Sequence, residues 1–233
     1  MKVIILAGGF GSRISEYTKT IPKPLIKIAG KPIIFHIMKH YSNHGYKDFI
    51  IAGGYKCHLL KNYFKKKILD WNVQVVNTGT RTMTGGRLKR LNRLINKENF
   101  LMTYGDGVSN ININKLVKFH IRNKKLATLS AVRPLSRFGV VKIKGNLVEQ
   151  FKEKAKLNQG WINGGFFVLN SNFLKLIKND QTYLEKEPLE IACKKKQLVA
   201  FKHTGFWHCM DTKRDKINLE KLFKNKKLNK SER

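Results

Sequence analysis

The chain opens with VIILA at residues 3–7, continues with GGFGSR at residues 8–13 and reaches PKPL at residues 22–25. An apolar, β-favouring run that ends in glycines predicts a buried strand followed by a tight loop. Because glycine has no side chain, the backbone N–H groups of such a loop can approach a bound anion closely. The stretch therefore predicts a phosphate-binding loop at the end of the first strand.

Two common phosphate loops do not fit this spacing. The dinucleotide-binding pattern needs other glycine positions and an acidic residue about 20 positions later, where this chain has Ile33. The Walker pattern needs Lys and then Ser or Thr directly after its last glycine, where this chain has Ser12 and Arg13. What remains is a loop with Arg13 and, after it, Lys23 between two prolines. A guanidinium fork and an ammonium point charge near one triphosphate indicate phosphoryl-group chemistry.

The hydrophobic periodicity after this loop predicts the fold class. It indicates a helix from Pro32 to about His44, a strand at 49–51, a helix at 58–67 and a strand at 73–76. This alternation predicts an α/β fold, Rossmann-like, with a mostly parallel sheet and helices on both faces. Ligands in such sheets bind at the carboxyl ends of the strands, where the glycine loop begins.

The rest of the chain continues in the same way. Strands are predicted at 100–104, 127–132 and 166–169, helices at 115–123 and from Leu189, and a hairpin joining 138–143 to 147–151. At 233 residues, we expect a single domain over residues 1–223 and a basic, frayed tail over 224–233.

Composition limits the class of protein. No apolar run reaches the roughly 18 residues of a membrane helix, and we expect a cytoplasmic protein. Cys57, Cys193 and Cys209 lie far apart and form no C-x-x-C pair. They therefore suggest neither a disulfide framework nor a zinc ribbon, and we take all three as ordinary thiols.

The net charge of +32, from 47 Lys and Arg against 15 Asp and Glu, is typical of a nucleic-acid or polyanion binder. The lysines are nevertheless spread along the chain and are not interleaved with aromatic residues as a base-stacking platform requires. We favour a solvated surface over a polyanion partner, and the second alternative stays open.

Two further patterns could bind metal. His36, His40 and His44 follow each other at helical spacing, which favours one flank of a helix and leaves a metal site as the alternative. Asp106 follows an apolar strand and lies between two glycines. It could form a plain Asp-Gly turn or hold Mg²⁺ beside a triphosphate, because magnesium prefers oxygen ligands.

Five stretches of sequence, in the same order as in a known family, carry a resemblance that covers nearly the whole chain. They are GKPIIFHIMKHYSNHGYKDFII from residue 30, NTGTRTMTGGRLKR from 77, TYGDGV from 103, INGGFFVLN from 162 and GFWHCMDTKRDK from 205. With the glycine loop, they resemble the sugar-1-phosphate nucleotidyltransferases, and among these the members that join CTP to glucose 1-phosphate. The resemblance implies the nucleotide-diphospho-sugar transferase fold, an Mg²⁺ cofactor, the substrates CTP and glucose 1-phosphate, a homo-oligomer and no nucleic-acid partner.

The resemblance also implies roles for individual residues. Catalysis would use Arg13 on the β- and γ-phosphates, Lys23 on the α-phosphate, and Asp106; Asp106 and Asp211 would bind the metal. Substrate contacts would come from Leu6, Ala7, Gly8, Gly9, Phe10, Gly11, Ser12, Thr82, Arg87, Gly105, Glu153, Lys154 and Asn163. Among these, Glu153 would meet sugar hydroxyls and Lys154 the sugar phosphate.

The chain departs from the family at two places. Ala155 stands where the family has a proline after Glu-Lys, and only residues 64–70 separate Tyr63 from Trp71, where the family has a longer insertion. Since phosphates are alike in every nucleotide, a relative that uses dTTP, UTP or GTP would keep the same loop. These nucleotides therefore stay open as alternatives to CTP.

Overall fold

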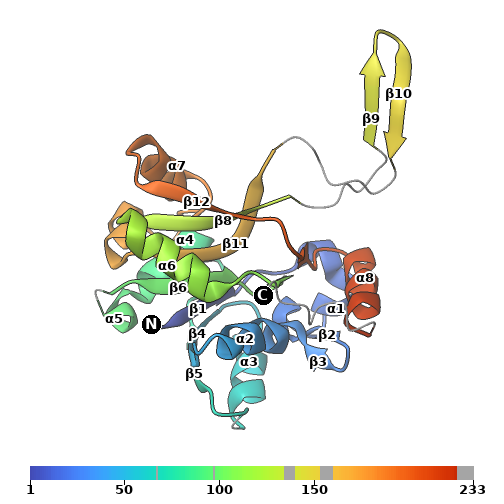
Figure 1. Ribbon diagram of the computed structural model, residues 1–233. Helices are drawn as coiled ribbons and strands as arrows, with labels where there is room; N and C mark the ends of the chain where they lie inside the picture. The colour runs from blue at the N-terminus through green and yellow to red at the C-terminus, as the bar shows by residue number, and fades with distance from the viewer. Residues whose placement is uncertain (67, 97, 134–139, 153–159, 225–233) are drawn as a thin grey trace.

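A computed structural model of the chain describes residues 1–66, 68–96, 98–133, 140–152 and 160–224. Seven strands form one sheet in the order β12-β8-β11-β6-β1-β4-β5 (Figure 1). Only β11 runs antiparallel to its neighbours in this sheet. The predicted α/β fold with a mostly parallel sheet is confirmed. The strand bounds are Val3–Ala7 (β1), Asp48–Gly53 (β4), Asn72–Asn77 (β5), Phe100–Tyr104 (β6), Ala127–Val132 (β8), Ile162–Leu169 (β11) and Leu198–His203 (β12).

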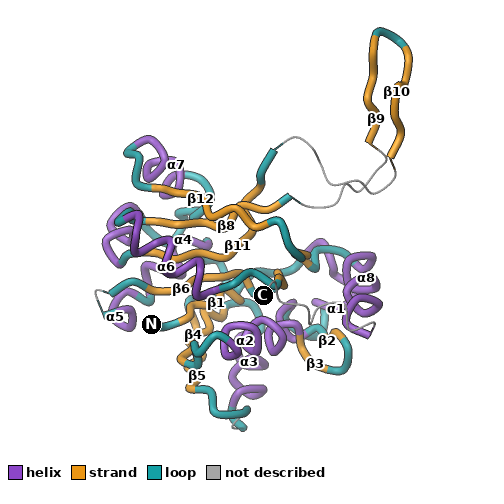
Figure 2. The backbone as a smooth tube through the Cα atoms, in the orientation of Figure 1, coloured by secondary structure: helices purple, strands orange, loops and turns teal. Residues whose placement is uncertain are grey.

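Helices lie on both sides of the sheet (Figure 2). They are Ser15–Thr18 (α1), Ile33–Asn43 (α2), Cys57–Phe64 (α3), Thr84–Arg90 (α4), Asn92–Ile95 (α5), Ile113–Asn123 (α6), Glu187–Lys194 (α7) and Lys213–Lys224 (α8). The described part also contains three short 3-10 helices, Ser12–Ile14, Lys23–Leu25 and Ser171–Leu176, and three small two-stranded sheets. These sheets pair Lys27–Ile28 (β2) with Lys31–Pro32 (β3), Gly107–Ser109 (β7) with Trp207–Cys209 (β13), and Val140–Lys144 (β9) with Leu147–Lys152 (β10).

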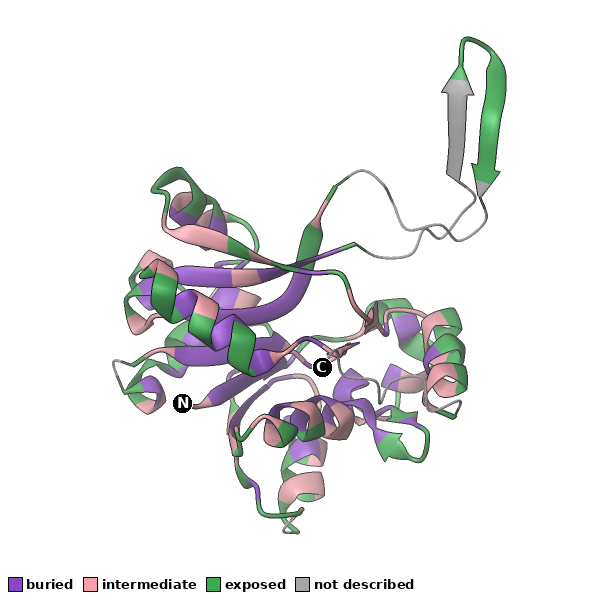
Figure 3. Cartoon of the chain, viewed as in Figure 1, coloured by how far each residue is buried: buried purple, intermediate pink, exposed green. Residues whose placement is uncertain are grey.

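Strand β1 is buried along its whole length because both faces of the sheet are covered (Figure 3). Val3 and Ile5 pack in one core with the apolar sides of α2 and α6, whereas Ile4 and Leu6 pack in a second core with α4, α5 and α7. Successive side chains of a strand point to opposite faces, so a continuous apolar run serves both cores. Each fully buried Ile contributes about 2 kcal/mol to folding by leaving water.

The structure differs from the sequence prediction in detail around residue 30. Residues 27–32 form the hairpin of β2 and β3, and α2 begins at Ile33, one residue after the predicted start at Pro32. The predicted hairpin near 138–151 is present as β9 and β10. Glu153, Lys154 and Ala155 lie outside the described residues. Of the predicted tail over 224–233, Lys224 ends α8, and residues 225–233 lie outside the described residues.

Parallel pairing puts the ends of three strands at one edge of the sheet. Because β1 pairs in parallel with β4 and β6, their last residues Ala7, Gly53 and Tyr104 lie close together. Strand β11 runs the opposite way, so its first residues, which include Asn163, reach the same edge. This edge carries the candidate site.

His36 and His40 on α2, and His44 directly after it, make hydrogen bonds with backbone carbonyls. Ring nitrogens of His36 and His40 bond the carbonyl oxygens of Ile28 and Ile111, each at 2.8 Å, and His44 bonds the carbonyl of His40 at 2.9 Å. None belongs to a cluster of metal ligands in the described part of the chain.

Among the described residues, no helix combines the length and the apolar character that crossing a lipid bilayer requires.

His40 is expected to make stability depend on pH. Burial, with the charge of His44 nearby, lowers its pKa from 6.5 to about 4. The unfolded chain therefore binds the proton more readily, and the stabilising effect of neutral His40 is lost as pH falls from about 6.5 toward 4. We expect the free energy of unfolding to fall by roughly 1 kcal/mol per pH unit in this window from His40 alone.

Urea denaturation at about pH 7 and about pH 5 measures this effect. The variant His40→Gln should lose less stability between the two pH values than the parent protein. His58→Gln, at an exposed position on α3, serves as the control and should leave the pH dependence unchanged. An equal pH dependence in His40→Gln and the parent would contradict the role of His40.

Candidate functional site

The glycine loop turns sharply after β1. Gly11 has φ +66°, a left-handed conformation that a side chain disfavours, and its carbonyl accepts a hydrogen bond from the backbone N–H of Ile14 at 3.0 Å. Phe10 is exposed, with its ring centroid 5.3 Å from that of Tyr55. The backbone of Gly9 is open, since a Cβ there would meet nothing within 4 Å. The loop therefore presents accessible backbone to the cavity, as the sequence predicted.

Arg87 holds this loop from behind. Its guanidinium donates to the carbonyl of Gly8 at 2.9 Å, to those of Gly53 and Gly79 at 3.1 and 2.6 Å, and to the Thr78 hydroxyl at 2.8 Å. The residue is only 4% exposed, and a Cβ on Gly8 would lie 2.2 Å from the guanidinium. The family resemblance implies that Arg87 contacts the substrate. In this structure its donors point to protein acceptors, so the nucleotide contact stays a prediction.

Exchanging Arg87 for lysine is expected to lower the free energy of unfolding by about 2 kcal/mol, because an ammonium cannot reproduce the fork and leaves buried carbonyls unpaired. The loop should loosen, so KM for the nucleotide should rise. Urea denaturation and steady-state kinetics measure the two effects. Arg90→Lys is the matched control: Arg90 lies on the same helix and pairs with Asp180 at the surface, so a change below about 0.5 kcal/mol is expected. Equal stability of the two variants would contradict the anchoring role.

Lys23 bridges the two predicted metal-binding carboxylates. Its Nζ lies 2.5 Å from an oxygen of Asp106 and 2.7 Å from an oxygen of Asp211, and Arg13 Nη1 lies 2.8 Å from the other oxygen of Asp211. The Lys23 side chain is 11% exposed, whereas that of Arg13 is 71% exposed. The buried Lys23 and the exposed Arg13 therefore place two positive groups beside Asp211.

A short strand pair brings the two carboxylates together from positions 105 residues apart in the sequence. Strand β7 pairs antiparallel with β13, so that Gly107 faces Cys209, and the Met210 N–H donates to the Asp106 carbonyl at 2.9 Å. Asp106 precedes β7 and Asp211 follows β13. Their side chains thus meet at the same end of this ladder.

Thr212 fixes the segment that follows. Its N–H and hydroxyl donate to a carboxylate oxygen of Asp215 at 2.8 and 2.9 Å, while the Asp215 N–H donates back to the Thr212 hydroxyl at 3.2 Å. This is a reciprocal cap at the start of α8. Thr212 therefore caps α8, and the Asp211 N–H also donates to this oxygen of Asp215, at 3.1 Å.

The close charges shift the pKa values of the cluster. Burial alone would lower the pKa of Lys23, but the Asp106 and Asp211 carboxylates outweigh it and raise that pKa. Burial works against the ionised form of Asp211, but the hydrogen bond and charge of Lys23 outweigh it and lower its pKa. Burial and both carboxylates raise the pKa of the Cys209 thiol. The cluster therefore holds an ammonium and an Asp211 carboxylate in contact with a neutral thiol.

A cavity of about 1450 Å³ contains all of these groups. A typical small-molecule pocket is about 300–1,000 Å³, so this one has room for a nucleotide and a second ligand. Every predicted site residue within the described part lines it: Leu6, Ala7, Gly8, Gly9, Phe10, Gly11, Ser12, Arg13, Lys23, Thr82, Arg87, Gly105, Asp106, Asn163 and Asp211. The structure therefore brings them together, and their individual roles stay predictions.

The cavity also holds a network that the sequence reasoning missed. The Tyr104 hydroxyl donates to one oxygen of Glu185 at 2.7 Å, and the Thr84 hydroxyl donates to the other at 2.6 Å. The segment before α7 carries Glu185 across to α4, where the Leu184 N–H donates to the Thr84 hydroxyl. No local sequence signal marks Glu185, because the contact joins residues about a hundred positions apart.

The sequence has close known relatives. A family model described as Nucleotidyl transferase matches residues 2–212. A glucose-1-phosphate cytidylyltransferase of Salmonella typhimurium is 47% identical, with 96% of each chain covered. A Bacillus subtilis protein named "Probable glucose-1-phosphate cytidylyltransferase" is 38% identical, also with 96% of each chain covered.

Solved structures show the same fold. The crystal structure of HddC from Yersinia pseudotuberculosis superposes with a TM-score of 0.75 at 23% identity, over 95% of this chain and 99% of that one. The likeness extends to nearly all of both chains, so the arrangement of sheet and helices is shared.

Proposed function

This chain belongs to the nucleotidyl transferase family, and from that membership we propose that it transfers the cytidylyl group of CTP to α-D-glucose 1-phosphate, releasing pyrophosphate and CDP-glucose. The 47% identity to the Salmonella cytidylyltransferase supports the choice of substrates. One observation of the site carries the proposal: Lys23 lies between Asp106 and Asp211 beside the glycine loop. Cations and carboxylates beside a phosphate-binding loop suit transfer between phosphates.

The proposed reaction is a direct displacement. An oxygen of the sugar phosphate attacks the α-phosphorus of CTP in line, and the bond from this phosphorus to the oxygen bridging to the β-phosphate breaks. Pyrophosphate leaves with the electron pair. Lys23 neutralises charge at the α-phosphate, and the exposed Arg13 contacts the β- and γ-phosphates and then the leaving pyrophosphate. Since the protein forms no covalent bond, its contribution is positioning and charge neutralisation.

Asp106 and Asp211 would hold Mg²⁺. The donor set fits, because carboxylate oxygens are the ligands that magnesium prefers and this pair already accepts a cation, the Lys23 ammonium. When bound, Mg²⁺ would supply positive charge that offsets the charge of the phosphates.

We further propose that the protein acts in the cytoplasm, where its substrates are, and that it forms a homo-oligomer. Leu147 and Phe151 on β10 are 77% and 65% exposed, and such apolar side chains suit contact with a second copy. Light scattering on the purified chain tests the assembly.

Pyrophosphate release by the purified protein tests the function. The assay contains Mg²⁺ and glucose 1-phosphate, with CTP, UTP, dTTP, GTP or ATP offered separately. We expect release with CTP. Preference for UTP, dTTP or GTP would keep the mechanism and correct the nucleotide. Release with none of them, together with salt-sensitive RNA binding, would overturn the proposal in favour of a polyanion binder.

A further inference from the structure

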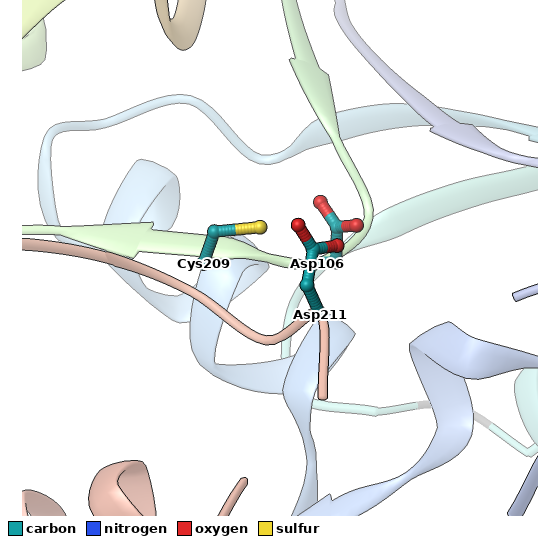
Figure 4. A group of neighbouring side chains, drawn as sticks. All are labelled: Asp106, Cys209 and Asp211. Atoms are coloured by element: carbon teal, nitrogen blue, oxygen red, sulfur yellow. The ribbon is translucent and has the colours of Figure 1, made fainter. Parts of the chain in front are cut away.

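The thiol of Cys209 lies beside the carboxylates of Asp106 and Asp211 (Figure 4). Donor atoms of Asp106, Cys209 and Asp211 all lie within 4.8 Å of one another, and each of the three residues is partly buried. Neither the reaction proposed above nor the predicted magnesium site uses this sulfur.

The backbone conformation explains why the Cys209 thiol faces Asp106. Met210 is fully buried in the core under α2 and α6. Neighbouring side chains of an extended segment point to opposite sides, so Cys209 and Asp211 both face away from that core, toward Asp106. The β7–β13 ladder fixes the third member, since Cys209 pairs with Gly107, the residue after Asp106. The three donors therefore converge through backbone pairing.

The carboxylates of Asp106 and Asp211 already bind a positively charged group. Lys23 Nζ lies 2.5 and 2.7 Å from oxygens of Asp106 and Asp211. Two carboxylates alone would favour a hard cation such as Mg²⁺. A sulfur donor beside them favours a softer one, and three protein donors with an open position are the usual ligand count of a catalytic zinc site.

We propose that Asp106, Cys209 and Asp211 form a binding site for a thiophilic divalent cation, Zn²⁺ or Cd²⁺, that competes with the magnesium of the reaction. On binding, the two carboxylates exchange the Lys23 ammonium for the cation. The sulfur forms a bond to the cation as its S–H bond breaks, and the proton goes to solvent. Binding is independent of the proposed function; the inhibition that follows rests on it.

Titration of the metal-free protein with Cd²⁺ tests the site directly. A cadmium–thiolate bond gives an ultraviolet charge-transfer absorption, so no substrate is needed. We expect this absorption in the parent protein and in Cys193→Ser, whose cysteine lies exposed on α7, and its loss in Cys209→Ser. Asp211→Asn should weaken cadmium binding by about tenfold or more. An absorption that persists in Cys209→Ser, or cadmium binding unaffected by Asp211→Asn, would overturn the proposal.

Zinc inhibition gives a second measurement. The Zn²⁺ concentration that halves pyrophosphate release should rise by about tenfold or more in Cys209→Ser, each variant being compared with its own zinc-free rate. Equal zinc sensitivity of the two proteins would remove the inhibitory role. If no nucleotide supports release, the proposed function fails, and the cadmium absorption still decides whether the site exists.

Discussion

Replacing Asp106 with asparagine is expected to lower turnover by about 10³-fold, or about 4 kcal/mol of transition-state stabilisation. The amide has nearly the shape of the carboxylate, so the chain should fold. It carries no charge, however, and is a poorer magnesium ligand. The cluster would keep Lys23 and Asp211 and lose half of the negative charge that attracts the metal.

Steady-state kinetics with saturating CTP and glucose 1-phosphate measure the loss. Asp70→Asn is the matched control, because Asp70 is 64% exposed and pairs with Lys47 at the surface. Its turnover should equal that of the parent. Turnover of Asp106→Asn within tenfold of the parent would exclude Asp106 as a metal ligand in the reaction.

Replacing Lys23 with alanine is expected to lower turnover by about 10² to 10³-fold, because the α-phosphate loses a fixed positive group. The same change should destabilise the metal-free protein by about 3 kcal/mol. It removes the ammonium that holds two partly buried carboxylates in contact, and like charges are left facing each other. Added Mg²⁺ should restore part of this stability, because a cation that binds only the folded state stabilises it.

Kinetics and urea denaturation, each with and without Mg²⁺, separate the two effects. Lys27→Ala, at an exposed position on β2, should change neither. Normal turnover in Lys23→Ala would exclude a phosphate contact. A metal-free stability equal to that of the parent would show that the ion pairs contribute nothing to folding.

Several features of the fold follow from local sequence alone. The apolar run at residues 3–7 needs both faces covered, which a parallel sheet between two helical layers provides. The strands at 100–104 and 127–132 lie where their β-favouring residues predict them. Gly8, Gly9 and Gly11 place the loop at the end of the strand, because Gly11 adopts a left-handed φ of +66° and the Arg87 guanidinium leaves no room for a Cβ on Gly8.

Local sequence could not supply the contacts between distant segments. The family resemblance places Arg87 among the substrate contacts, but its hydrogen bond to the Gly8 carbonyl depends on how α4 packs against the sheet. Glu185 meets Tyr104 and Thr84 only after the segment before α7 crosses the cavity. Such contacts have no periodic signal, because they depend on tertiary packing rather than on neighbours in the chain.

Periodicity, glycine and charge are local properties, so they were enough to predict the mostly parallel sheet, the glycine loop at its first strand and the residue types around that loop. Which charged side chains contact each other depends on the packing of segments far apart in the chain. The β7–β13 ladder joins Asp106 to Asp211 and brings in Cys209, a residue that its spacing in the sequence marks as an ordinary thiol. Lys23 then lies between the carboxylates, because in a partly buried cluster a positive charge is most stable beside two negative ones.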